Sequence, residues 1–225
     1  MNEDSNKKSK KMNTAYISIS AVILIFGIWA VPKIVGTFSK ADMAYILNEN
    51  EEPTKVPAFS FTDQNGETIT NENYDGKVYV AEFFFTTCPS ICPIMNRNMV
   101  KVQNEFYGNP DFGIASFTIN PELDTPEVLK QYADNYKVTN PNWHMLTGDK
   151  TAIYKLANEG FHIYAGESLD SDEVFEHSGL FALMDQEGNI RSRYDENGNA
   201  LIYYDGLEAE GIQMLIEDIK ILLNE

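Results

Sequence analysis

The sequence predicts an α/β fold in which helices flank one mixed central sheet. Segments rich in Val, Ile, Phe and Tyr alternate with segments whose apolar residues recur at helical spacing. Residues 77–86 form a long apolar run, which is typical of a central strand buried on both faces. A predicted hairpin near the C-terminus adds antiparallel pairs to the sheet. The chain has 225 residues, of which 43% are hydrophobic, so one core of this kind can form.

The first half of the predicted domain contains a hairpin, the central strand and a helix. Alternating residues at 58–62 and 67–70 flank a polar turn that ends in glycine, which predicts an N-terminal hairpin. After the central strand, apolar residues at helical spacing predict a helix over 91–107. A Gly-Asn-Pro sequence then ends this helix.

Strands and helices continue to alternate in the second half. Thr125 precedes a proline and is the predicted N-cap of one helix, and Asp149 is the predicted cap of the next. A Gln-Glu-Gly turn joins two later apolar segments into a hairpin. The predicted strands are 112–119, 142–146, 180–185 and 189–194, and the predicted helices are 126–137, 150–158 and 207–223.

The N-terminal segment has the pattern of a membrane anchor. Four lysines lie within residues 1–13, and residues 14–31 contain no charge. Eighteen helical residues span about 27 Å, close to the roughly 30 Å hydrocarbon core. The upstream lysines predict a cytoplasmic tail at 1–13, a single-pass transmembrane anchor at 14–36, and a domain on the periplasmic or extracytoplasmic side. A cleaved signal peptide is the alternative, but no small-residue cleavage site follows the run.

Residues 37–55 are polar and acidic, and predict a linker to a domain at 56–225. The whole chain has a formal net charge of -17, and residues 41–225 carry -21. Like charge opposes the phosphate backbone, so we expect no nucleic-acid partner. The acidic surface serves solubility or, alternatively, meets a basic partner. Two cysteines and three histidines limit any metal site to a single small one.

Cys88 and Cys92 are the residues on which the chemistry concentrates. They lie where the buried strand gives way to a helix, and a helix N-terminus stabilises thiolates. We therefore expect at least one cysteine, and Cys88 first, to have a pKa below the usual value of about 8.5. Three interpretations stay open: a structural disulfide or buried thiols, a dithiol redox site, and a soft-metal site. The C-x-x-x-C spacing differs from the C-x-x-C of redox motifs and does not separate the last two.

Three motifs around these residues resemble the Sco/SenC family of copper-binding assembly proteins. They are FFFTTCPSICP at 83–93, SFTINPELDTPE at 116–127 and EHSGLFALMDQEGNIRSRYD at 176–195. The resemblance implies a thioredoxin-like fold, one bound copper ion as Cu(I) or Cu(II), and a role in assembling the binuclear copper site of cytochrome c oxidase. The copper-bearing subunit of that oxidase would be the partner. Carried over by motif, the metal ligands are Cys88, Cys92 and His177.

The residue chemistry agrees with this resemblance, because two thiolates and an imidazole suit the soft ion Cu(I). A copper chaperone would act without turnover. The alternative is a thiol-disulfide reductase that keeps the partner's copper-site cysteines reduced, with Cys88 attacking and Cys92 resolving. A redox or copper sensor is a third possibility. Thioredoxin-like oxidoreductases resemble one another in a cis-proline that faces the cysteines, and this chain has no proline after Pro141, which favours copper.

One residue departs from the family's second motif, because Asn120 stands where an aspartate is usual. Any role of that carboxylate in copper exchange is therefore in doubt, whereas Asp124 is retained. The remaining candidates have no motif behind them. We expect His144 and His162 to be structural, and Met95 and Met99, at helical spacing, to lie in the core.

Overall fold

The structure is a computed structural model that describes residues 19, 22–24, 26–27, 43–167 and 175–225. The chain divides into two units, residues 1–41 and 42–225. In the first unit the described residues are helical. Most of the predicted anchor at 14–36, with the tail before it, lies outside the described residues. Within the described part of the chain, no helix combines the length and the apolar character needed to cross a membrane.

The second unit is an α/β fold built on a mixed sheet. The sheet order is β1-β10-β9-β4-β5-β6-β2-β3, and β11 pairs with β9 outside this path. Its elements, in chain order, are β1 (Ala44–Tyr45), β2 (Ser60–Asp63), β3 (Thr68–Thr70), the 3₁₀ turn η1 (Asn71–Tyr74), β4 (Val78–Phe84), α2 (Cys92–Glu105), β5 (Phe112–Thr118), α3 (Pro126–Tyr136), β6 (Trp143–Thr147), α4 (Lys150–Lys155), the π-helical turn η2 (Leu156–Gly160), β7 (Ala165–Glu167), β8 (Phe175–His177), β9 (Leu180–Met184), β10 (Ile190–Ser192), β11 (Tyr204–Asp205) and α5 (Ala209–Leu222).

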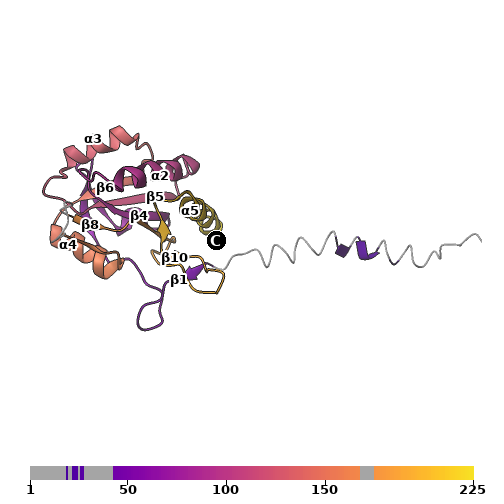
Figure 1. The fold of residues 1–225 in the computed structure, drawn as a ribbon. Helices are drawn as coiled ribbons and strands as arrows, with labels where there is room; N and C mark the ends of the chain where they lie inside the picture. The colour runs from indigo at the N-terminus through magenta and orange to yellow at the C-terminus, as the bar shows by residue number, and fades with distance from the viewer. Residues whose placement is uncertain (1–18, 20–21, 25, 28–42, 168–174) are drawn as a thin grey trace, which may run out of the picture. The chain divides into compact units, whose positions relative to one another are not determined.

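The strands at the centre of the sheet run parallel, and those around them are antiparallel. β4 pairs with β5 and β5 pairs with β6 in parallel, whereas β9 runs antiparallel to β4. In Figure 1, α2 and α3 lie on one side of this sheet and α4 lies on the other. The predicted mixed sheet flanked by helices is therefore confirmed, and so is the N-terminal hairpin, as β2 and β3.

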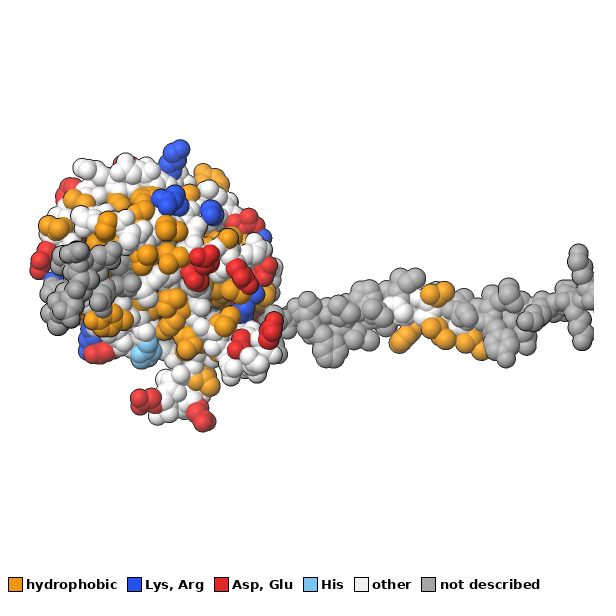
Figure 2. All heavy atoms as spheres, viewed as in Figure 1, with side chains coloured by type: hydrophobic (Ala, Val, Ile, Leu, Met, Phe, Trp, Pro, Cys, Tyr) orange, Lys and Arg blue, Asp and Glu red, His pale blue; other side chains and the backbone are white. Residues whose placement is uncertain are grey.

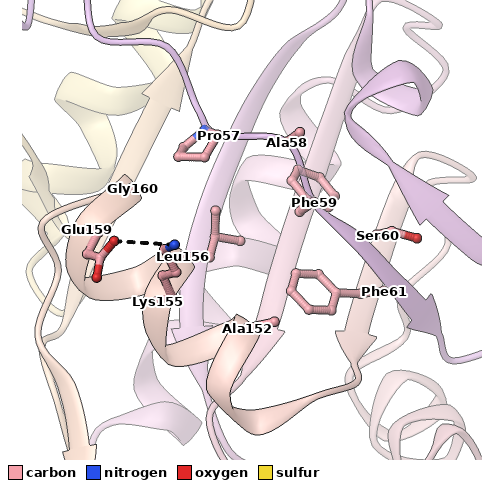
Figure 3. Close-up of a pocket in the computed structure, with 10 residues that line it drawn as sticks. All are labelled: Pro57, Ala58, Phe59, Ser60, Phe61, Ala152, Lys155, Leu156, Glu159 and Gly160. Atoms are coloured by element: carbon pink, nitrogen blue, oxygen red, sulfur yellow. Dashed lines mark ion pairs between the residues drawn. The ribbon is translucent and has the colours of Figure 1, made fainter.

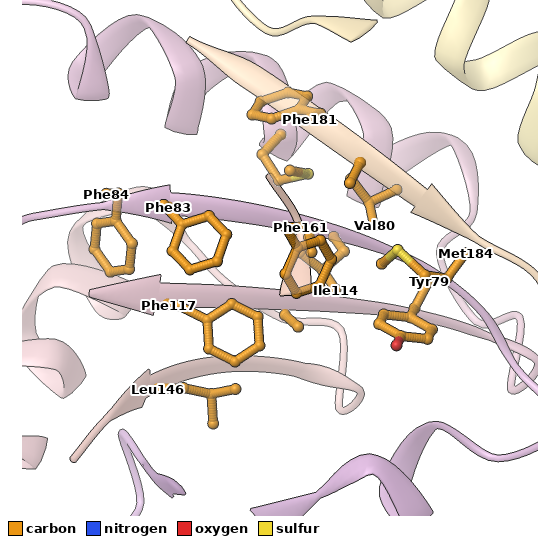
Figure 4. Close-up of a cluster of buried hydrophobic side chains, with 14 of the residues drawn as sticks. Tyr79, Val80, Phe83, Phe84, Ile114, Phe117, Leu146, Phe161, Phe181 and Met184 are labelled. Atoms are coloured by element: carbon orange, nitrogen blue, oxygen red, sulfur yellow. The ribbon is translucent and has the colours of Figure 1, made fainter. Parts of the chain in front are cut away.

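The core forms where the sequence predicts a strand buried on both faces. Every residue of β4 and of β5 is buried. Phe83 stacks on Phe117 with ring centroids 5.3 Å apart, and Phe161 meets Phe83 edge-on at 5.5 Å (Figure 4). These aromatic side chains occupy one face of the sheet centre, so the end of β4 that leads to the cysteines is held rigidly.

The helix caps follow the expected chemistry. The Thr125 side chain accepts a hydrogen bond from the backbone N–H of Val128 at 3.4 Å, and Asp149 accepts one from Ala152 at 2.8 Å. By contrast, α2 begins at Cys92 with no side-chain cap. The helix predicted over 150–158 is shorter than expected, because a π-helical turn replaces its last part.

The predicted linker is too long at its C-terminal end, because residues from 43 onward belong to the folded unit. β1 pairs with β10, and Thr54 accepts a hydrogen bond from the backbone of Ile190 at 2.9 Å. The Arg191 guanidinium lies 4.0 Å from the centroid of the Tyr45 ring. A polar, acidic composition does not reveal such short edge pairing, because a two-residue strand has no readable periodicity.

Candidate metal centre

The two cysteines lie together at the junction of β4 and α2. β4 ends at Phe84 and α2 begins at Cys92, so Cys88 is in the connecting loop and Cys92 is the first residue of the helix. The backbone N–H of Cys92 donates to Cys88 Sγ at 3.4 Å. Neither cysteine is in a disulfide. The expected placement of both thiols at a helix N-terminus is confirmed, and two soft donors are available side by side.

Burial distinguishes the two thiols. Cys88 is 6% exposed and Cys92 is fully buried. The hydrogen bond with Cys88, followed by burial, raises the pKa of the Cys92 thiol well above its usual value, and a hydrogen bond with the backbone of Phe85 opposes this shift. Cys92 is therefore not the cysteine whose pKa the helix N-terminus lowers, because its pairing and desolvation outweigh the helix dipole, and the lowering expected first for Cys88 stays a prediction.

The second motif is packed against the cysteine loop. Asp124 accepts a hydrogen bond from the backbone N–H of Thr86 at 3.1 Å, and from the side-chain hydroxyls of Thr86 and Thr118. Asn120, at the position of the missing aspartate, is buried and its backbone N–H donates to Thr118 Oγ1 at 3.0 Å. The retained carboxylate of Asp124 therefore contacts the cysteine loop directly in this chain.

The third motif begins in β8, a short strand that the sequence analysis does not predict. His177 pairs with Ala165 of β7 in a separate two-stranded sheet. A three-residue strand with two polar members shows no periodicity, so the sequence does not reveal it. The structure describes the backbone of His177 but not its side chain.

The strand that follows places His177 at the same edge of the sheet as the cysteines. β9 begins at Leu180 and is antiparallel to β4, with Ala182 opposite Ala81. The start of β9 thus lies beside the end of β4, and the chain reaches it directly from β8. Of the described side chains, which do not include that of His177, no three His, Cys, Asp or Glu residues cluster as a metal site.

Of the other two histidines, His144 has the structural surroundings that we expected. His144 Nδ1 lies 3.1 Å from Asp63 Oδ2, and its ring meets Tyr74 edge-on. His162 is exposed, with a φ of 50°, in the turn after the π-helical segment. Met95 and Met99 are fully buried in the core, as predicted.

Sequence reasoning missed one titratable residue near this site. Glu82 is fully buried in β4, and Ser116 Oγ donates to its Oε1 at 2.7 Å. Trp143 Nε1 in turn donates to Ser116 Oγ at 2.9 Å. Burial raises the pKa of the Glu82 carboxyl to about 7, against the lowering effect of Ser116, and its charge contributes to the raised pKa of Cys92. The available signal was a single acidic residue inside an otherwise apolar strand, six positions before Cys88.

A pocket of about 430 Å³ lies elsewhere in the folded unit, between the N-terminal hairpin and α4. Figure 3 shows Phe59, Phe61 and Leu156 on its walls, with the ion pair of Lys155 and Glu159 beside them. None of its lining residues comes from the cysteine loop or from α2. The cavity and the cysteine loop are therefore formed by different residues.

The comparisons with known proteins agree with the three motifs. The family model SCO1/SenC matches residues 48–210. The SCO1 protein homolog of Bacillus subtilis is 32% identical over 168 residues, which are 74% of this chain and 81% of that protein.

Two solved structures resemble the fold. ScoI of Bradyrhizobium japonicum, solved with copper bound, has 25% identity and a TM-score of 0.57, over 75% of this chain and 99% of that chain. BsSco has 30% identity and a TM-score of 0.62, over 78% of this chain and 95% of that chain. It is described as a member of the Sco family of cytochrome c oxidase assembly proteins with a disulfide switch. The family model alone covers most of the folded unit, and the three motifs at 83–93, 116–127 and 176–195 fall within it. The chain is therefore a member of the SCO1/SenC family.

Proposed function

We propose that this chain is a membrane-anchored copper chaperone that binds one copper ion through Cys88, Cys92 and His177. The observation that supports it best is the pair of adjacent, unoxidised thiols at the end of β4. A family member with copper bound supports copper as the cargo. Two thiolates and one imidazole would form a three-coordinate set that holds Cu(I) and tolerates Cu(II).

The proposed role is assistance in assembling the binuclear copper site of cytochrome c oxidase. A relative described as an oxidase assembly protein supports this choice of partner. Copper would pass by ligand exchange to cysteines of the copper-bearing subunit. The uncharged run at 14–31, preceded by lysines, supports an anchor at 14–36 that keeps the domain on the periplasmic or extracytoplasmic side of the membrane.

A copper titration of the reduced full-length chain in detergent tests the ligand set. We expect one copper ion per chain. His177→Ala should weaken binding by at least the roughly tenfold that loss of a supporting group costs a metal site. It should also remove most of the loss of affinity below about pH 6.5, because an imidazole must be unprotonated to bind.

His162→Ala is the matched control, because His162 is an exposed histidine outside the three motifs. It should bind copper as the parent does. If the parent and His177→Ala bind copper with equal affinity from about pH 5 to about pH 8, on either side of the usual histidine pKa, His177 is not a ligand.

The thiol-disulfide reductase is the second candidate, and the unequal burial of the two thiols favours it. Both thiols are buried, but Cys88 keeps 6% of its surface exposed and Cys92 keeps none, so Cys88 is the thiol that a disulfide substrate would reach first. The disulfide switch described for BsSco is in line with this chemistry in a relative. Turnover of a disulfide substrate that is unaffected by His177→Ala would place this candidate first.

A further inference from the structure

The carboxylate of Asp124 is buried under the cysteine loop. Its side chain is fully buried, at the end of the crossover between β5 and α3. The three hydrogen bonds described above reach it from neutral groups, one backbone N–H and two threonine hydroxyls. A buried carboxylate is costly unless it is well hydrogen-bonded, so this group holds its donors in fixed positions.

Asp124 fixes the cysteine loop midway between the sheet and Cys88. At the start of the loop, the backbone N–H of Ile119 donates to Phe84 O at 2.8 Å. Two residues later, Thr86 donates to both carboxylate oxygens of Asp124. Further along the loop, the backbone N–H of Cys88 donates to Phe85 O at 3.3 Å. The position of Cys88 therefore depends on the contact between Thr86 and Asp124.

Asp124 is itself held by rigid elements. Its backbone N–H donates to Asn120 O at 2.9 Å, which closes a compact turn after β5. Thr118, the last residue of β5, donates to the carboxylate and accepts from the backbone of Asn120. Because β5 pairs with β4 along its whole length, Asp124 ties the cysteine loop to the centre of the sheet.

We propose that Asp124 is a positioning residue that keeps Cys88 close to Cys92. The proposal deepens the function proposed above, and rests on it where copper is concerned. Two thiols held at a short distance react with a high effective concentration, both in closing a disulfide and in sharing one metal ion. If the contact with Thr86 is lost, the cysteine loop is held less firmly, the two thiols are close together less of the time, and both processes become less favourable.

The disulfide equilibrium in glutathione buffer measures this effect without copper. The reaction converts the Cys88 and Cys92 thiols and one oxidised glutathione into the intramolecular disulfide and two reduced glutathiones. In Asp124→Asn, an amide NH₂ replaces one acceptor oxygen, and the equilibrium constant for disulfide formation should fall at least tenfold, which is about 30 mV. Thr86→Val should shift it in the same direction, and Thr86→Ser should restore the parent value.

Asp63→Asn is the matched control, because Asp63 is also a fully buried carboxylate but belongs to the N-terminal hairpin. It should leave the disulfide equilibrium unchanged. If folded Asp124→Asn or Thr86→Val has the same equilibrium constant as the parent, the proposal is wrong. If Asp124→Asn does not fold, the two Thr86 variants alone test the proposal. Because this reaction involves only thiols and glutathione, failure of the parent to bind copper would contradict the chaperone function and leave the positioning role to be judged separately.

Discussion

A single buried carboxyl in the central strand costs this protein stability at neutral and alkaline pH. The Glu82 carboxyl has a pKa of about 7, compared with 4.5 as its unperturbed value, mainly because it is buried. Since the pKa is raised on folding, the protonated form is favoured in the folded state. The free energy of unfolding should therefore decrease as the pH rises from about 4.5 through 7, by about 3 kcal/mol in total.

Glu82→Gln removes this titration and keeps an acceptor for Ser116. Relative to the parent, the variant should gain about 2 to 3 kcal/mol in the free energy of unfolding between pH 5 and pH 8, as measured by urea denaturation. Asp195→Asn is the control, because hydrogen bonds from Asn199 and Asn197 lower the pKa of its exposed carboxyl, so it stays ionised over this range. If the free energy of unfolding changes in parallel for the parent and Glu82→Gln between pH 5 and pH 8, Glu82 does not titrate in that range.

At the level of residues, the sequence predicted the thiols but not the acid beside them. Cys88 and Cys92 stand out because a strand-to-helix junction is a recognisable place for paired thiols. Glu82 does not, because one polar residue leaves the apolar character of the run at 77–86 intact. Asp124 was noted only as a retained motif residue, since its contact with Thr86 joins two crossovers that are distant in sequence.

At the level of elements, the C-terminus of α3 contains a removable strain. Lys137 caps this helix in the left-handed conformation, with a φ of 58°. A non-glycine residue in that conformation costs about 1 kcal/mol, and glycine is the common residue at this position. Lys137→Gly should therefore raise the free energy of unfolding by up to about 1 kcal/mol in urea denaturation.

Lys137→Ala separates this backbone effect from the loss of the lysine side chain. Alanine has a Cβ atom and keeps the strain, so this variant should not share the gain. If glycine and alanine stabilise the protein equally, the change comes from the side chain and the strain argument is wrong.

Every element of seven or more residues shows a readable period and was predicted from it. β4, α2, β5 and α5 each extend over seven or more residues, and each lies within its predicted segment. The strands β1, β7, β8 and β11 have two or three residues each and were not predicted. Their positions depend on pairing partners far away in the sequence, which local pattern does not encode.

At the level of the whole molecule, charge is distributed unevenly along the chain. Residues 1–40 carry six lysines and two acidic residues, whereas residues 41–225 have a net charge of -21. Figure 2 shows acidic side chains at several separate places on one face of the folded unit. An acidic domain of this kind would attract a basic partner surface and repel nucleic acid, and the rate of such an association would fall with added salt.

The lysines before the apolar run give a direct test of the proposed topology. In intact spheroplasts, an external protease should degrade the domain that begins near residue 43 and leave a cytoplasmic marker protein uncut. Carbonate extraction should leave the uncut protein in the membrane, whereas a cleaved signal peptide would release it. Positive residues are retained on the cytoplasmic side of the membrane. Replacing all four upstream lysines, Lys7, Lys8, Lys10 and Lys11, with glutamine should therefore reduce the fraction of the protein whose domain is exported. Full protection of the domain until the spheroplasts are lysed would mean that it is not exported, and a copper site outside the cytoplasm would then be excluded.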